Sequence, residues 1–170
     1  VISVSQDWRI PDGASVILLP GRLTRWKGHH VLIEALSSLK DRKDIFCVLL
    51  GSDQGRREYR QELELAINEK GLNGLIRIVD HCRDMPAAYM AASIVVSAST
   101  DPEGFGRVPV EAQAMGRPII ATDHGGATET VIHNETGWLV PPNDPDTLAA
   151  ALEHALALSQ DGRAKLAENA

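Results

Sequence analysis

Three cations and two glycines share one short segment, Gly21-Arg22-Leu23-Thr24-Arg25-Trp26-Lys27-Gly28, which follows an apolar run typical of a buried strand. Glycine lets a ligand approach the backbone closely, and the planar guanidinium of Arg22 can bind phosphate oxygens through two parallel hydrogen bonds. Lys27 adds a compact charge that can neutralise a second phosphate. The segment is not a Walker A loop, because GxxxxGK[ST] is absent. A solvated basic turn without a ligand is the alternative for this segment taken alone.

A second group of candidate residues follows a later apolar run. Gly104 and Gly106 precede a helix that we expect to begin near Pro109, so backbone amides stay free at its positive end, where anions bind. Glu103 would then be unfavourable beside an anion unless it faces neutral hydroxyl groups. Glu111 lies near the first turn of the same helix, and its alternative role is a surface acid that stabilises the helix dipole.

The elements that must position these segments alternate regularly. Apolar runs predict buried strands over residues 15–19, 45–50, 75–79, 94–97, 118–122 and 137–140. Amphipathic segments predict helices around residues 31–39, 59–67, 89–90, 112–115, 145–156 and 163–170. This alternation predicts an α/β fold: a Rossmann-like, doubly wound parallel sheet of about six strands with helices on both faces. Ligands of such folds bind at loops after the carboxyl ends of strands, where both candidate segments lie.

Composition narrows the classes of function. A chain of 170 residues suits one well-cored domain, and a net charge of −6 disfavours nucleic acid as a partner. Cys47 lies in an apolar run and is expected to be buried. Neither it nor Cys82 belongs to a CxxC pair or a metal-binding spacing, so we predict no metal site and a reducing, cytoplasmic setting. No apolar run is long enough for a membrane span.

At this point the residues resemble a known family. The segment from Glu103 to Glu111, EGFGRVPVE, is similar to the E-x7-E motif of the retaining group-one glycosyltransferases, which have the GT-B fold. The motifs GRLxxxKG, Gly51-Ser52-Asp53, Gly125-Gly126 and Gly137-Trp138-Leu139-Val140 occur in the family's usual order. The resemblance covers roughly residues 15–158. It implies that residues 1–170 form a single domain, the donor-binding C-terminal half of such an enzyme, and that the N-terminal acceptor domain is absent from this chain.

The resemblance also implies roles for the matching residues. Arg22 and Lys27 would bind the donor's diphosphate and stabilise the charge that develops as the nucleotide leaves. Glu111 would accept hydrogen bonds from the ribose hydroxyls. Glu103 would contact hydroxyls of the transferred sugar.

Further contacts to the donor follow from the same resemblance. Gly21 would let the phosphate-binding backbone approach closely, and the amides of Phe105 and Gly106 would lie near the sugar. The base would rest against the loop after the third strand, near Val79 and His81. The donor would be a UDP-, GDP- or ADP-sugar, transferred with retention of configuration and without a metal or another cofactor. Alone, the chain would bind nucleotide weakly and transfer nothing, and any attachment to the inner face of the membrane would be made by the absent domain.

The chain departs from the family pattern at several positions. Arg107 replaces an aliphatic residue and is expected to project into solvent, the alternatives being contact with an acid or with another phosphate. His81 replaces a small residue, while Arg25 and Trp26 stand where an acid and proline are common. The segment 125–129 is either a loop near the donor or a helix start after a glycine turn.

His29 and His30 open the first predicted helix, and we expect them at the surface or at a hinge. Three other functions compete with the transferase. One is an epimerase or phosphorylase of the same fold, and another is a non-catalytic nucleotide-sensing or protein-binding module. A dinucleotide-dependent dehydrogenase is disfavoured, because no GxGxxG follows the first strand.

Overall fold

The computed structural model describes residues 2–170, which form a six-stranded sheet with helices on both faces. All strands are parallel and lie in the order β3-β2-β1-β4-β5-β6. Their bounds are β1 (Ser15–Pro20), β2 (Ile45–Leu50), β3 (Ile76–Val79), β4 (Ile94–Ser97), β5 (Ile119–Thr122) and β6 (Trp138–Val140). The predicted α/β sheet is therefore confirmed, and every strand agrees with its predicted bounds to within one residue.

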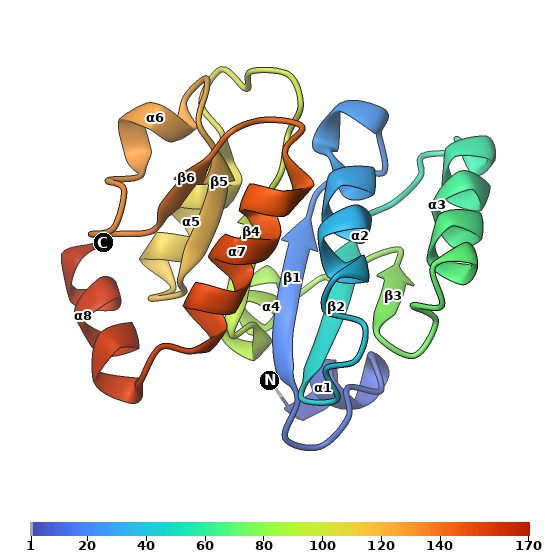
Figure 1. Ribbon diagram of the computed structural model, residues 1–170, viewed down its shortest axis with the longest axis horizontal. Coiled ribbons are helices and arrows are strands. Elements are labelled where there is room, and N and C mark those ends of the chain that lie inside the picture. Colours follow the sequence, from blue (N-terminus) through green and yellow to red (C-terminus); the bar gives the residue numbers. More distant parts are fainter. Residues whose placement is uncertain (1) are drawn as a thin grey trace.

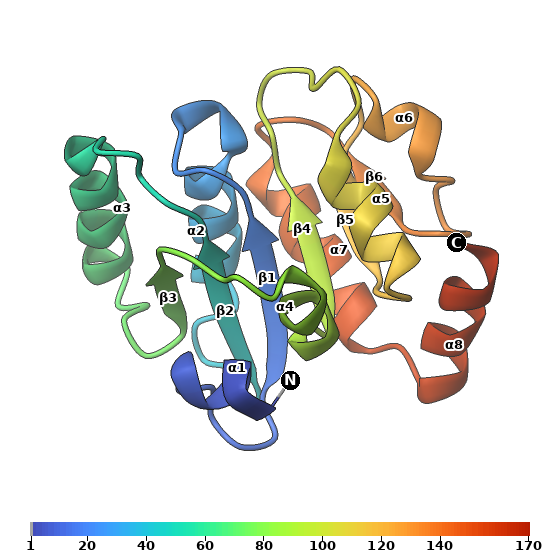
Figure 2. The ribbon, with the colours of Figure 1, turned by 180° about the vertical axis from the view of Figure 1, so that it is seen from behind.

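Helices cover the two faces of the sheet in separate layers. The helices are α1 (Ile2–Asp7), α2 (His29–Ser37), α3 (Arg57–Glu69), α4 (Met85–Ala91), α5 (Arg107–Ala114), α6 (Ala127–Thr130), α7 (Pro145–Leu156) and α8 (Gln160–Asn169), with a 3₁₀ turn η1 (Arg25–Lys27). Figure 1 shows α2, α3 and α7 in front of the sheet, and Figure 2 shows α1, α4 and α5 on the opposite face. No helix within residues 2–170 is long and apolar enough to cross a membrane.

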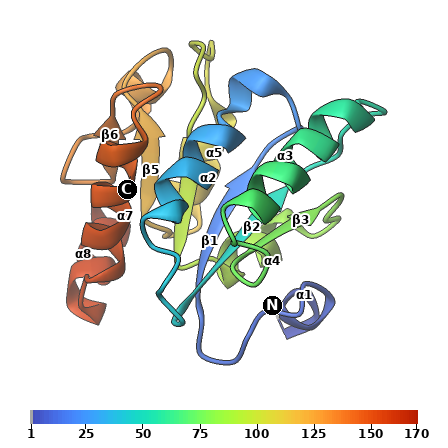
Figure 3. The same cartoon turned by 45° about the vertical axis from the view of Figure 1, so that its right-hand side comes forward.

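Two apolar cores follow from the alternation of side chains along the strands. In β1, Ile17 and Leu19 pack with residues of α2, α3 and α7, whereas Val16 and Leu18 pack with residues of α1, α4 and α5. Figure 3 shows α2 and α3 lying across one face of the sheet. Because burying one such side chain contributes about 1.5–3 kcal/mol, β1 is firmly anchored from both sides. Cys47 in β2 is buried as expected, and burial raises the pKa of its thiol.

The strand order changes direction at β1 and β4, which lie side by side. The chain leaves β1 toward β2 and leaves β4 toward β5, so the two loops diverge above the carboxyl ends of these strands. Figure 2 shows the arrowheads of β1, β2, β3 and β4 at this one edge. The amide of Thr100 donates to the carbonyl of Trp26 at 2.7 Å and ties the two loops together. Gly28 has φ +73°, and a Cβ there would overlap the carbonyl of Ala98, so this close approach requires glycine.

Two helices differ from the sequence expectations, and a third decides between two alternatives that the sequence left open. The short helix α1 was not predicted at all. The helix α6 settles the alternative for residues 125–129, which form a helix start after a glycine turn. The last helix begins at Gln160, three residues earlier than predicted, where Ser159 caps it through a 3.1 Å hydrogen bond from the amide of Gly162.

The expectation for His29 was wrong, because this residue is fully buried, whereas His30 is exposed as expected. The first turn of α2 places His29 against α3. There its Nδ1 lies 3.3 Å from the Tyr59 hydroxyl, and the two rings meet edge to face. A polar partner supplied by a different helix makes the burial tolerable. Burial lowers the pKa of His29 to about 4.

This pKa predicts a pH dependence of stability. Between pH 6.5 and pH 4 the unfolded chain takes up a proton on His29 that the folded chain refuses, so the free energy of unfolding falls as the pH falls. The loss attributable to His29 is at most about 3 kcal/mol across this interval. Denaturant unfolding of His29→Gln should show a correspondingly smaller decline over the same pH range than the wild-type chain. His81→Gln, at an exposed position, is the control for removing one histidine. Parallel curves for the wild-type chain and His29→Gln would contradict the assignment.

Candidate functional site

A cavity of about 840 Å³ opens at the carboxyl ends of β1 and β4. Its volume falls within the range typical of small-molecule sites. The walls come from the loops after these two strands and from α4 and α5. The sequence-predicted residues that line it are Gly21, Arg22, Lys27, Glu103, Phe105, Gly106 and Glu111. The topology therefore brings both candidate segments to one place.

An ion pair joins the two loops across this cavity. Lys27 Nζ lies 2.8 Å from Glu103 Oε2, and the two side chains are only 13% and 19% exposed. The turn η1 ends at Gly28 in the left-handed conformation and presents Lys27 to the cavity, with Nζ 4.5 Å from the centre of the Trp26 ring. An ammonium group has three N–H donors, so the bond to Glu103 leaves two for a ligand. Lys27 also supplies the positive partner that the largely buried carboxylate of Glu103 needs.

The backbone of Glu103 is fixed by the glycine turn after β5. The amide of Gly126 donates to the carbonyl of Glu103 at 2.8 Å. Gly125 has φ +59°, and a Cβ there would overlap the backbone of Glu103. A side chain at Gly126 would likewise overlap the carbonyl of Phe105. The Gly125-Gly126 pair therefore lets the loop of Glu103 lie against the turn after β5, although neither glycine lines the cavity.

Glu111 is held by a partner that the sequence analysis missed. Tyr89 on α4 donates its hydroxyl to Glu111 Oε2 at 2.7 Å. Burial and the adjacent Glu111 carboxylate raise the pKa of the Tyr89 phenol, so it remains a donor throughout the ordinary pH range. The other oxygen of Glu111 lies 4.0 Å from Arg107 Nε, and the Arg107 side chain is 84% exposed, as expected for a residue that projects into solvent.

The cavity combines groups of both charges. Arg22 and Arg107 are exposed on its wall, beside Lys27 and the two carboxylates of Glu103 and Glu111. The amino-terminal end of α5 adds backbone N–H groups, because α5 begins directly after Gly106. Within residues 2–170, no group of three or more His, Cys, Asp and Glu side chains is placed to hold a metal ion.

The apolar side of the cavity differs from the sequence expectation. Val79 and His81 do not line it, so their contact with a base stays a prediction. Met85 and Pro86, which begin α4, form this wall together with Tyr89 and other residues. The available signal was Asp84-Met85-Pro86, an N-cap followed by a first-turn proline, and the Asp84 carboxylate indeed accepts from the amide of Ala87 at 2.9 Å.

Comparison with known proteins agrees with this architecture. Residues 3–170 match the family model of the group 1 glycosyl transferases. The chain is 37% identical over 155 residues to a D-inositol 3-phosphate glycosyltransferase from Jonesia denitrificans, a match that covers 88% of this chain and 36% of that protein.

Solved structures give the same result. The crystal structure of a glycosyltransferase from Rickettsia africae superimposes with a TM-score of 0.95 and 36% identity, covering 98% of this chain and 44% of that chain. HepE from Anabaena, solved in complex with UDP-glucose, superimposes with a TM-score of 0.90 and 32% identity, covering 98% and 45% of the two chains. This chain thus spans less than half the length of these relatives. Sequence motifs, fold and cavity agree, and the chain belongs to the group 1 glycosyl transferases.

Proposed function

We propose that this chain is the donor-binding domain of a retaining glycosyltransferase and binds a nucleoside-diphosphate sugar. The proposal rests on the distribution of cationic groups and carboxylates within one cavity. Arg22, Lys27 and the amino-terminal end of α5 suit a diphosphate. The carboxylates of Glu103 and Glu111 suit vicinal hydroxyls of a sugar and a ribose. The UDP-glucose bound to the similar Anabaena protein supports this class of ligand.

The donor's orientation follows from the positions of these groups. Glu111 lies between α4 and the cavity, next to the apolar wall of Met85 and Pro86, where a ribose and a base would rest. Glu103 lies next to Lys27, where the diphosphate meets the transferred sugar. With one oxygen bound by Lys27, Glu103 keeps further lone pairs for hydroxyl donors.

In the transfer reaction, this domain stabilises the leaving group. As the bond between the anomeric carbon and the diphosphate oxygen breaks, negative charge grows on the diphosphate, and Arg22 and Lys27 stabilise it. The acceptor hydroxyl forms the new bond on the same face of the sugar and passes its proton to the departing phosphate. Fixed cations beside the diphosphate supply the charge that a metal ion would otherwise supply, which supports transfer without a metal. Losing one such contact costs roughly 2–4 kcal/mol of transition-state stabilisation.

The remaining half of the reaction belongs outside this chain. Because the chain covers less than half of its relatives, we propose that a second, N-terminal domain binds the acceptor and closes over the cavity. The chain alone would then bind donor nucleotides without transferring sugar.

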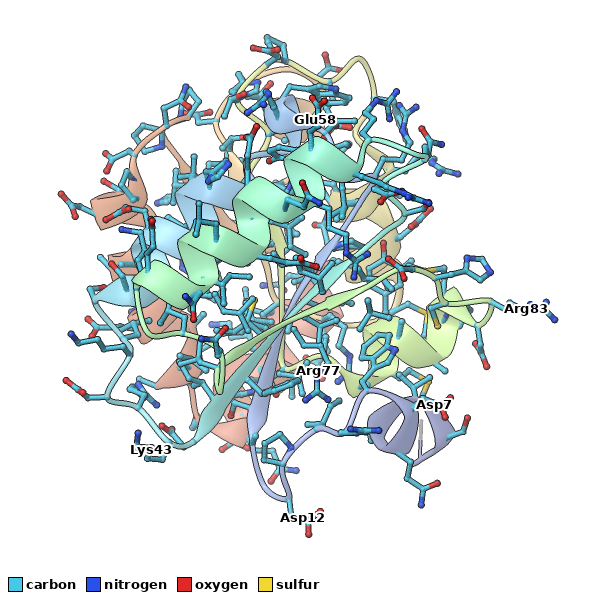
Figure 4. The ribbon with its side chains drawn as sticks, turned by 90° about the vertical axis from the view of Figure 1, so that its right-hand side faces the viewer. Asp7, Asp12, Lys43, Glu58, Arg77 and Arg83 are labelled. Atoms are coloured by element: carbon cyan, nitrogen blue, oxygen red, sulfur yellow. The ribbon has the colours of Figure 1, made fainter. Side chains whose placement is uncertain are left out.

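Calorimetric titration of UDP, GDP and ADP into this chain tests the proposal. One of the three should bind preferentially. Lys27→Met should weaken that binding at least tenfold, because it removes a charge-assisted contact to phosphate. Lys43→Met is the matched control. Figure 4 shows Lys43 at the end of the molecule opposite to Glu58, which lies in the first turn of α3. The affinity of Lys43→Met for the preferred nucleotide should equal that of the wild-type chain.

Three results would contradict the proposal. Equal loss of affinity in both lysine variants would show that Lys27 is not a specific phosphate ligand. No binding by any nucleotide would favour a module that has kept the fold without the donor. If the wild-type chain inverted the configuration of a sugar carbon in a free nucleotide-sugar, without an acceptor, the protein would be an epimerase instead.

The role of Glu111 is tested with the preferred nucleotide and its 2′-deoxy analogue. Hydrogen bonds to a charged group contribute about 1.5–3 kcal/mol, so the wild-type chain should bind the deoxy analogue roughly ten- to a hundredfold more weakly. In Glu111→Ala this difference should largely disappear. Glu129→Ala, which removes an exposed carboxylate on α6, should retain it. A full ribose preference in Glu111→Ala would place the ribose elsewhere.

A further inference from the structure

Behind Glu103, on the side away from the cavity, two side chains from the end of β5 converge on one backbone carbonyl. The carbonyl oxygen of Ser99 accepts a hydrogen bond from Thr122 Oγ1 at 2.9 Å and another from His124 Nε2 at 2.8 Å. Ser99 and Thr122 are only 2% and 4% exposed. The hydroxyl of Ser99 in turn donates to Glu103 Oε1 at 2.5 Å. A chain of hydrogen bonds therefore runs from β5 through Ser99 to the carboxylate of Glu103.

The donor and acceptor roles in this chain are fixed by chemistry. A carbonyl oxygen can only accept, so the hydrogen of His124 must reside on Nε2. Its other ring nitrogen, Nδ1, is buried and has no hydrogen-bond partner among residues 2–170. Buried polar atoms are usually paired, and an unpaired one carries a cost. At His124 one ring nitrogen therefore stays unpaired, and the ring makes its one hydrogen bond to the carbonyl of Ser99.

These residues do not themselves reach the proposed donor. Ser99, Thr122 and His124 are absent from the walls of the large cavity, whereas Glu103 lines both that cavity and the small space that it shares with them. The space that they share with Glu103 is only about 10 Å³, too small for a sugar ring or a nucleotide. Their influence on a ligand must therefore pass through the carboxylate.

We infer that Ser99, Thr122 and His124 are positioning residues that set the orientation of Glu103 toward the donor's sugar. The inference rests on the proposed function. Ser99 holds Oε1 and Lys27 holds Oε2, so the carboxylate is gripped at both oxygens, and the lone pairs that remain point in fixed directions. Removing the support from β5 releases Ser99 and leaves Glu103 held only by the flexible lysine. Recognition of the sugar is then lost, while recognition of the nucleotide remains.

The test compares two probes that differ only in the sugar, UDP and UDP-glucose, titrated into this chain by calorimetry. GDP and GDP-mannose replace them should the wild-type chain prefer guanosine. Ser99→Ala removes the hydroxyl that touches Glu103, Thr122→Val is nearly isosteric, and His124→Ala removes the ring. In Ser99→Ala and His124→Ala the dissociation constant for the nucleotide-sugar should rise about tenfold, while that for the nucleoside diphosphate should change less than twofold. Thr122→Val should show the same split with a smaller rise, because the His124 bond to Ser99 remains.

A conservative replacement separates positioning from mere packing. His124→Gln keeps an N–H donor for the Ser99 carbonyl and should restore the wild-type ratio of the two affinities. His154→Ala, at an exposed position on α7, should leave the ratio unchanged. Melting temperatures identify any variant that fails to fold, and Ser99→Ala, which leaves the Ser99 carbonyl and both its donors in place, then carries the test.

Each other outcome would overturn the inference. An equal loss of affinity for both probes would mean that these residues only support the fold, and an unchanged ratio in Ser99→Ala would mean that Glu103 needs no support. Failure of the wild-type chain to bind any of the four probes, or ADP, would reject the proposed function itself. That result is distinguishable, because it precedes any comparison of variants.

Discussion

The ion pair between Lys27 and Glu103 is the contact on which the arrangement of the cavity depends. Both side chains are largely removed from water, and a charge in such a place needs a partner. Each is the partner of the other, although they lie on loops 76 residues apart. The sheet makes their meeting possible, because β1 and β4 are neighbours at the position where the strand order changes direction. The topology of the sheet thus brings these two opposite charges into contact.

Two glycines set the distances that this contact requires. Gly28 lets the loop after β1 lie against Ala98, and Gly125 lets the loop after β5 lie against Glu103. Both have positive φ angles, and at both positions a side chain would overlap a neighbouring backbone. The loop of Glu103 is therefore enclosed between two others whose backbones touch it or its neighbours. A carboxylate held in this way loses little further freedom when it binds a ligand, which is a requirement of preorganised sites.

The sequence predicted the sheet and the two loops that line the cavity for identifiable physical reasons. Buried parallel strands are continuous apolar runs, and glycine, cation and carboxylate motifs mark the loops after them, so β1 and β4 and their loops could be assigned from local pattern. The same local pattern did not indicate α1, whose Val4 is buried in the core beside residues of α4. Arg77 donates a hydrogen bond to the carbonyl of Trp8, which directly follows this helix. Figure 4 shows Arg77 above this helix. The burial of His29 likewise depends on Tyr59, which lies 30 residues further along the chain.

Partners of the site residues were the least predictable feature. Tyr89 was placed in a helix, and its hydroxyl reaches Glu111 only because α4 packs beside α5. Ser99 and His124 come from loops after different strands, and neither carries a motif that indicates a ligand. Val79 and His81, which the family resemblance assigned to the base, do not line the cavity, and their contact with a base stays a prediction. Local pattern identifies the residues that a ligand would touch, and tertiary packing identifies those that orient them.

The charge balance of the cavity affects the relative affinities for donor and product under the proposed function. Lys27 is already engaged by Glu103, so a free nucleoside diphosphate must share this lysine with a carboxylate that repels it. A nucleotide-sugar presents the same phosphates together with hydroxyls that satisfy the carboxylate. Glu103 therefore lowers the affinity for the product more than the affinity for the donor, and it strengthens only those interactions that require an intact sugar. An acid beside a phosphate site, which looks unfavourable from sequence alone, then discriminates between substrate and product, and it depends on Lys27 to remain there.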